Sequence, residues 1–64
     1  MKQKEIKNLA KKIAKQEMIL QISTDSHAKA RAEQEIMRLS SCVKSIEDMV
    51  ALDDAIQDIL AKNS

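Results

Sequence analysis

Cys42 and His27 are the only cysteine and the only histidine of this chain, and their side chains are its first candidates for nucleophilic or metal chemistry. They are 15 positions apart on one predicted helix, which separates them by about 22 Å at 1.5 Å per residue. A cysteine nucleophile needs its histidine base within hydrogen-bond reach, so these two residues cannot act together in one subunit. A lone histidine in a first helical turn is typical of a solvated surface residue.

The patterns that hold metals or cofactors in helical proteins do not occur in the sequence. The HExxH zinc motif and the Glu-x-x-His ligands of di-iron bundles are both absent. The lack of glycine also excludes a Gly-rich phosphate loop. Cys42 lies between the apolar residues Leu39 and Ile46 and is expected to behave as a small buried hydrophobe. We therefore predict a protein that is not an enzyme, with no catalytic residue, no metal and no cofactor.

A row of lysines makes the first third of the chain strongly basic. Residues 1–20 hold six lysines and two glutamates, a net charge of +4. Four of the lysines recur every three or four positions and share one side of a helix: Lys4, Lys7, Lys11 and Lys15. Such a face is typically solvated, and the alternative is a surface that binds RNA or DNA. The overall charge of +1, the two arginines and the absence of aromatic residues weigh against that alternative.

The composition of the 64 residues predicts an all-α fold in one domain, 1–64. Glycine and proline are absent, which argues against β-hairpin turns, and residues that favour helices dominate. A chain this short buries little core and is marginal alone, and one cysteine cannot form an internal disulfide. Oligomerisation is the remaining way to stabilise the fold, so we expect a homodimer or a higher helical-bundle oligomer.

Apolar residues in the centre of the chain recur at the spacing of a packed helix. The steps alternate between four and three residues, as in a coiled-coil seam, through Ala32, Ile36, Leu39, Val43, Ile46 and Val50. An earlier apolar row consists of Ile6, Leu9, Ile13 and Leu20. We expect an antiparallel helical hairpin in which this earlier row faces Ile36, Leu39, Val43 and Ile46.

Three helices are predicted, over residues 2–22, 26–51 and 53–62. The run Ser-Thr-Asp-Ser at 23–26 is the best break in the chain, because all four side chains favour caps and turns. Asp25 or Ser26 is expected to cap the second helix. Near residue 51 the apolar stripe rotates by roughly 100°, and Asp53 and Asp54 could cap a short third helix there. The alternative is one long helix from 26 to 62, kinked or uninterrupted.

The C-terminal part of the chain is acidic. Residues 44–64 carry five acidic residues and two lysines, a net charge of −3. In a hairpin that turns at 23–25, the residues beyond 48 have no partner and must fold back or pair with another chain. We expect the basic first helix and the acidic tail to lie near each other.

Several apolar residues are not needed for a two-helix seam: Met18, Ile22, Met49, Ile56 and Ile59. We predict that they form a protein-binding surface on a small non-catalytic interaction protein that binds a larger protein and regulates or inhibits it. Cover by the third helix or by self-association explains the same residues equally well. Nucleic-acid binding through the lysine face is the alternative function.

No apolar run in the sequence approaches the length of a membrane span, and the longest covers residues 49–52. The basic N-terminus lacks the apolar region of a signal peptide. Together with the initial methionine, these features lead us to expect a complete small cytoplasmic protein.

Overall fold

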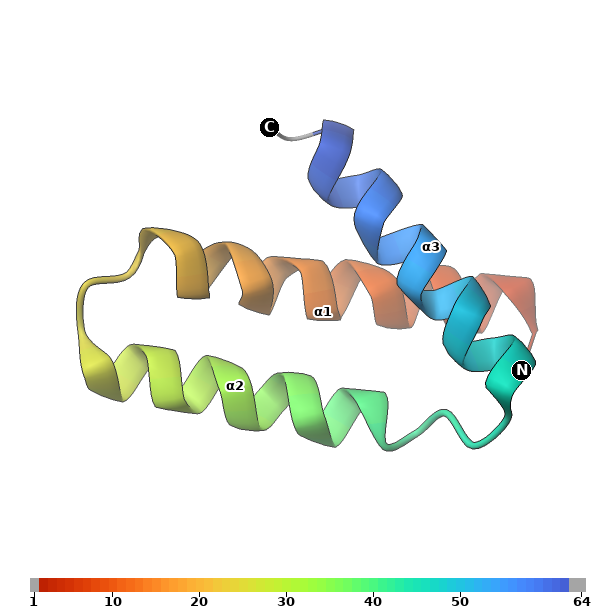
Figure 1. Ribbon diagram of the computed structural model, residues 1–64, viewed down its shortest axis with the longest axis horizontal. Coiled ribbons are helices and arrows are strands. Elements are labelled where there is room, and N and C mark those ends of the chain that lie inside the picture. The colour runs from red at the N-terminus through yellow and green to blue at the C-terminus, as the bar shows by residue number, and fades with distance from the viewer. Residues whose placement is uncertain (1, 63–64) are drawn as a thin grey trace.

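The computed structural model describes residues 2–62, and over that range the chain forms three helices and no strand. The helices are α1 (Gln3–Ile22), α2 (Ser26–Ser40) and α3 (Ile46–Lys62). In Figure 1, α2 runs back alongside α1, and α3 crosses over the N-terminal half of α1. The predicted all-α hairpin with a third helix is confirmed. None of the helices within residues 2–62 is long and apolar enough to cross a membrane.

The turn between α1 and α2 lies where the run of capping residues predicts it. The N–H of Ser23 donates to the carbonyl oxygen of Ile19 at 2.9 Å, which closes the last turn of α1. Asp25 has an extended backbone, and its carboxylate accepts a hydrogen bond from the backbone N–H of His27 at 3.1 Å. Asp25 is therefore the N-cap of α2, because its side chain satisfies one of the N–H groups that the first helical turn leaves free.

The second break lies at residues 41–45, and the helix predicted over 26–51 is wrong. The alternative of one helix from 26 to 62 is wrong for the same reason. Residues 40–43 are Ser-Ser-Cys-Val, whose side chains are poor helix formers. The hydroxyl of Ser41 donates to the carbonyl oxygen of Arg38 at 2.7 Å. The N–H groups of Cys42 and Val43 bond to carbonyls three residues earlier instead of four, and these tighter turns end α2.

The start of α3 is defined by Ser45 and not by the predicted cap at Asp53 and Asp54. The Ser45 hydroxyl oxygen accepts a hydrogen bond from the N–H of Asp48 at 3.1 Å, and its carbonyl accepts from the N–H of Met49 at 3.0 Å. Glu47 and Asp48 place negative charge in the first turn, where the helix dipole favours it. Asp53 and Asp54 lie inside α3, so an acidic pair alone does not mark a helix start.

Replacing Ser45 by alanine is expected to lower the free energy of unfolding by about 0.5–2 kcal/mol, because alanine cannot accept the hydrogen bond from Asp48. Urea denaturation followed by far-UV circular dichroism measures the loss. Ser26→Ala is the matched control, since Ser26 lies inside the first turn of α2 and is exposed. An equal effect of the two substitutions would contradict the assignment of Ser45 as a cap.

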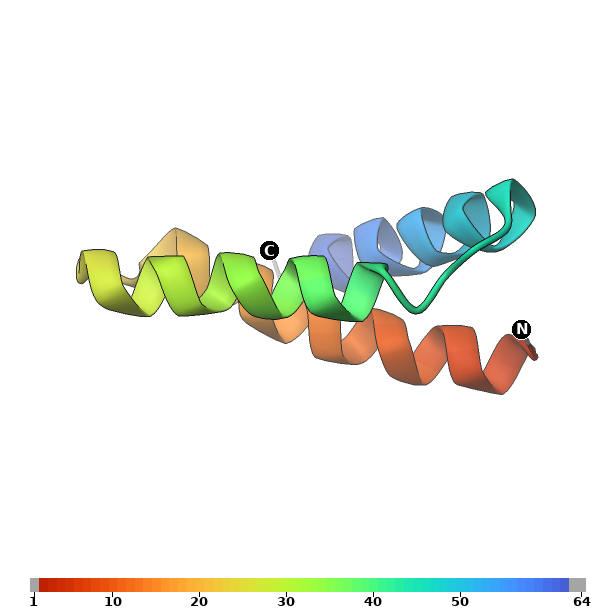
Figure 2. The ribbon, with the colours of Figure 1, turned by 90° about the horizontal axis from the view of Figure 1, so that it is seen from below.

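The core lies where α2 and α3 both pack against α1. Eight buried residues form one cluster: Ile6, Leu9, Ala10, Ile13, Ala14, Val43, Leu52 and Ile56. Five of these belong to α1, so α1 is the central element and the other two helices cover different sides of it. No Cα atom of the described helix α2 lies within 8 Å of one in α3. Figure 2 shows the linker 41–45 leading away from the end of α2 to the start of α3.

The predicted seam is confirmed in its first half and wrong in its second. Ile36 and Leu39 pack against the core cluster, Val43 is buried in it, and the facing residues Ile6, Leu9 and Ile13 are buried. Leu20, the last residue of the facing row, is only half-buried and is not among the core residues. Ile46 and Val50 are 79% and 57% exposed. Because the chain is not helical at 41–45, Ile46 and Val50 belong to α3 and not to α2. Their spacing in the sequence continues the seam, but their side chains do not lie on the same face as the seam residues of α2.

The N-terminal basic helix and the acidic tail lie together, as the charge pattern predicts. One hollow of about 470 Å³ is lined by charged residues of both helices: Lys7, Lys11, Asp54, Asp58 and Lys62. Within α3, the ammonium of Lys62 is 3.3 Å from the carboxylate of Asp58. These groups are exposed, so each pair contributes little stability, but opposite charges on the two helices favour this packing over alternatives.

Candidate protein-binding groove

A groove separates α2 from α3, and its floor is α1. It exists because both helices pack on α1 without approaching each other. Ile13 and Glu17 of α1 line the floor, and the volume is about 290 Å³. That volume is at the lower limit for a site that holds a drug-sized ligand. The groove is better suited to receive individual side chains than a whole small molecule.

The walls of the groove are mainly apolar. Ile36 and Ser40 line it from α2, and Val43 lines it from the linker. Three apolar residues of α3 line the opposite wall: Met49, Leu52 and Ile56. Their spacing of three and four residues places them on one side of α3. Methionine is flexible and polarizable, and it adapts to differently shaped apolar partners.

Apolar side chains continue outward from the α3 wall of the groove. Met49 lines the groove and is also 54% exposed. Ile46 and Val50, which the sequence pattern predicts in the core, are exposed beside it on the first turns of α3. Positions 46, 49 and 50 share one face of a helix. The exposed side chains of Ile46, Met49 and Val50 therefore form a continuous apolar patch at the edge of the groove.

The predicted protein-binding residues separate into two groups. Ile56 is buried in the core and Ile59 is partly buried against it, because α3, which carries both residues, packs on α1. The prediction that Ile56 forms part of an accessible surface is therefore wrong. Met49 is exposed at the groove, Met18 is half-buried, and Ile22 is exposed at the last turn of α1. The structure does not bring these three together at one site.

Two accessible apolar residues were missed by the sequence pattern. Ile46 and Val50 fit the seam spacing, which predicts them in the core. The signal that could have corrected this is the Ser-x-x-Asp sequence at 45–48, which is typical of a helix start. Met37 is also strongly exposed on α2, as its position away from the seam indicates.

The lysine face remains on the outside of α1. Lys4, Lys7, Lys11 and Lys15 are all exposed. Lys7 and Lys11 share the charged hollow with acidic residues of α3, and those carboxylates reduce the positive potential that a phosphate backbone would meet. This juxtaposition weakens the argument for a nucleic-acid surface.

His27 and Cys42, the two candidates for nucleophilic or metal chemistry, lie at opposite ends of α2. His27 is exposed in the first turn. Cys42 follows the last turn and is exposed, so the expectation of a buried cysteine is wrong. Its Sγ lies 3.9 Å from the carbonyl oxygen of Arg38. No group of three or more His, Cys, Asp or Glu side chains within the described residues could hold a metal ion.

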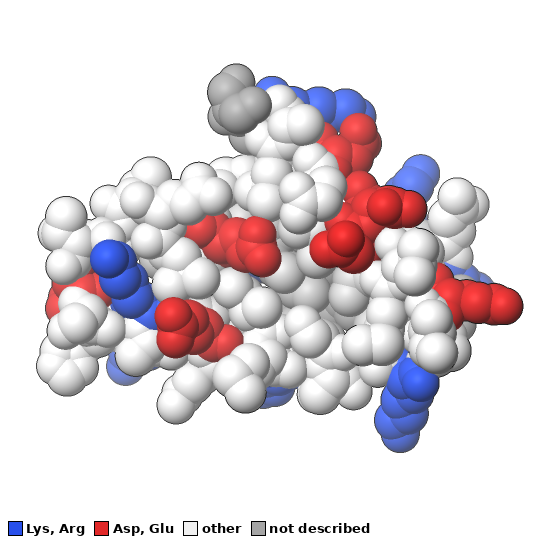
Figure 3. Space-filling model, viewed as in Figure 1, with Lys and Arg blue, Asp and Glu red and all other residues white. Residues whose placement is uncertain are grey.

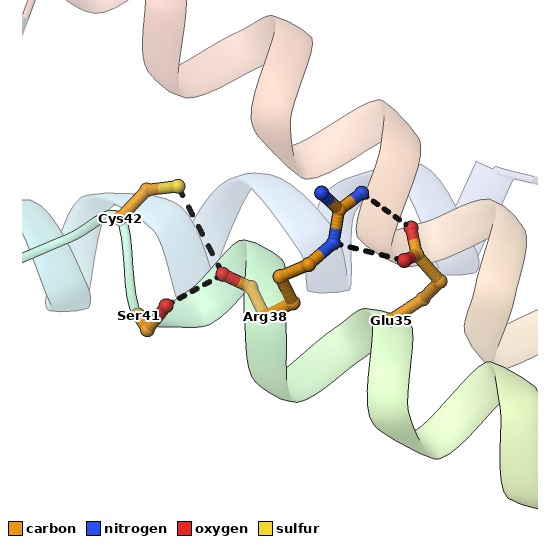
Figure 4. Close-up of polar contacts among 4 residues, drawn as sticks. All are labelled: Glu35, Arg38, Ser41 and Cys42. Carbon is orange, nitrogen blue, oxygen red and sulfur yellow. Dashed lines mark hydrogen bonds and ion pairs between the residues drawn. The ribbon is translucent and has the colours of Figure 1, made fainter.

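The polar contacts near the end of α2 are local to that helix. The guanidinium of Arg38 donates two hydrogen bonds of 2.9 Å to the carboxylate of Glu35 (Figure 4). These bonds lower the pKa of Glu35 below its ordinary value. Both side chains are well exposed, so solvent screens the pair. Ser41 and Cys42 both point toward the Arg38 carbonyl (Figure 4), which makes this cluster a helix terminus and not a reactive centre.

Comparisons of the chain with protein-family models, with curated proteins and with solved structures found no match.

Proposed function

We propose that this chain is a non-catalytic helical protein that binds a larger protein through the α2–α3 groove and the adjacent apolar patch of Ile46, Met49 and Val50. The single observation that carries the proposal is that these three side chains are exposed together beside an apolar groove. Grouped apolar exposure of this kind is typical of interaction surfaces. Occupying a surface of the partner would let so small a protein regulate or inhibit it.

Self-association uses the same exposed side chains and stays a prediction. The sequence predicts it on two grounds: so short a chain buries little core, and apolar residues lie on more than one side of its helices. Because α3 folds back onto α1 and buries Leu52 and Ile56, part of that apolar surface is covered within one chain. We therefore propose a different protein as the occupant of the groove.

The proposed function is tested by affinity capture from the native cell with two variants. One carries Ile46→Ser, Met49→Ser and Val50→Ser, and the other carries Lys4→Glu and Lys15→Glu. The second variant avoids Lys7 and Lys11, because glutamate there would face Asp54 and Asp58 and could displace α3. The apolar-patch variant should lose a protein partner that the lysine variant keeps, since only the first removes apolar contact area.

Circular dichroism must first show that both variants retain the helical content and thermal stability of the parent chain. The opposite result would overturn the proposal: loss of the partner in the lysine variant alone, with the partner being RNA or DNA. Such binding would also weaken steeply as salt increases, because Lys contacts release counterions from phosphates.

A further inference from the structure

The charge around the groove points to the chemistry of its partner. Glu17 lines it from α1 and Asp53 lines it from α3, so a carboxylate lies on each of two elements that border the apolar floor. Neither lysine nor arginine is among the described residues that line the groove. Glu17 is half-buried and Asp53 is exposed, so both carboxylates can meet a charged group from outside.

The same asymmetry is visible on the whole face that carries the groove. Figure 3 shows the side of the molecule on which α3 lies in front of α1, with α2 running beside them. Acidic atoms gather along α3 and over the middle of this face, while lysine and arginine atoms lie mainly at its edges. A partner that approaches this face meets a negative potential around an apolar centre.

The shape of the groove selects a helix as the partner element. Two helices border it over a floor formed by a third, and its 290 Å³ can hold only a few side chains. An amphipathic helix places apolar residues at every third or fourth position on one side, which suits an apolar groove bordered by two helices. The exposed patch of Ile46, Met49 and Val50 would extend the contact beyond the groove.

A second copy of the chain fits this face poorly. A two-fold symmetric contact centred on the groove brings the same surface of both copies together. Glu17 and Asp53 of one copy would then approach Glu17 and Asp53 of the other, and opposed like charges disfavour such a contact. The partner should therefore carry the opposite charge.

We propose that the groove binds an amphipathic helix of a different protein, in which an apolar stripe is flanked by lysine or arginine. The inference rests on the proposed protein-binding function and adds the charge and shape of the partner. The apolar stripe supplies the contact area, and the flanking cations pair with Glu17 and Asp53. Two exposed ion pairs predict a preference of roughly 2- to 30-fold for a basic over an acidic helix.

The test uses two synthetic helical peptides with the same leucine stripe and one tryptophan each. One peptide has lysine beside the stripe, and the other has glutamate at the same positions. Because the protein contains no aromatic residue, tryptophan fluorescence reports the peptide alone. The lysine peptide should bind more tightly, and its advantage should shrink at about 1 M salt, where the Debye length falls to about 3 Å.

Substitutions in the protein test whether the peptides bind at the groove. Glu17→Gln with Asp53→Asn should reduce the advantage of the lysine peptide to about twofold or less. Glu5→Gln with Glu47→Gln is the matched control, because it removes two exposed charges outside the groove and should leave most of the advantage. Met49→Ser should weaken both peptides, since it removes an apolar wall of the groove.

The outcomes separate this inference from the function on which it rests. Equal binding of both peptides that depends on Met49 would overturn the inference and leave apolar protein binding intact. Tighter binding of the glutamate peptide, or no binding of either, would also overturn it, and the capture experiment then decides the proposed function independently. Sedimentation equilibrium that shows a dimer abolished by Met49→Ser would assign the groove to a second copy and overturn the inference.

Discussion

Replacing Ile13 by alanine is expected to lower the free energy of unfolding by about 2–5 kcal/mol. Ile13 is 1% exposed, lies in the core cluster and forms part of the groove floor, so its side chain supports α2 and α3 at once. A 64-residue domain has a total stability of roughly 3–10 kcal/mol, so this one substitution removes a large part of it. Urea or thermal denaturation followed by circular dichroism measures the loss.

Ile22→Ala is the matched control for Ile13→Ala, because it is the same chemical change on the same helix at a side chain that is 79% exposed. Its effect should stay within about 0.5 kcal/mol, the range of ordinary surface substitutions. A loss at Ile13 no larger than that at Ile22 would show that α1 is not the central element of the fold.

Replacing Ala10 by leucine is expected to destabilise the protein by about 1–3 kcal/mol, although it adds apolar surface. Ala10 is fully buried, and Ala14 follows it one turn later in the same cluster as Leu52 and Ile56. Each of these alanines follows by three residues a lysine (Lys7 or Lys11) that shares the charged hollow with α3, so we expect both to face α3, where a leucine at position 10 has no space. The larger side chain should push α3 outward and leave the α1–α2 hairpin in place.

Amide hydrogen exchange distinguishes this local displacement of α3 from general unfolding. Protection should fall most in α3 and least in the part of α1 that faces α2, because elements that pack weakly open first. Ala51→Leu is the control, since Ala51 is exposed on α3 and leucine is also a good helix former. A uniform loss of protection over all three helices would contradict the close-packing role of Ala10.

Apolar spacing in the sequence predicts only part of the exposed apolar surface of this protein. Ile56 and Ile59 do not fit the spacing of a two-helix seam, yet Ile56 is buried in the core and Ile59 packs against it. Ile46 and Val50 fit the seam and end exposed. Periodicity identifies which residues share a side of one helix, but the partner of that side depends on where the neighbouring helices lie.

Local sequence patterns are enough to predict the helical class, the turn at 23–25 and the buried row Ile6, Leu9 and Ile13 of α1. These features depend on local chemistry: helix-favouring side chains, the Asp25 cap and a repeat within a single uninterrupted helix. The opposite charges of α1 and α3 likewise indicated that these two helices lie together. The first three signals act over a few residues or along one helix, and the charge signal needs only the net charge of each of the two helices.

Which apolar faces are covered follows from the way the helices pack, and apolar spacing in the sequence does not predict it. The tighter turns at Cys42 and Val43 and the Ser45 cap place the break at 41–45, and a few residues of linker then rotate and redirect all of α3. Because α3 crosses α1 without approaching α2, it buries Leu52 and Ile56 and leaves Ile46 and Val50 beside an open groove. The groove is thus a consequence of the direction in which α3 crosses α1, and apolar spacing along one helix carries no information about that direction.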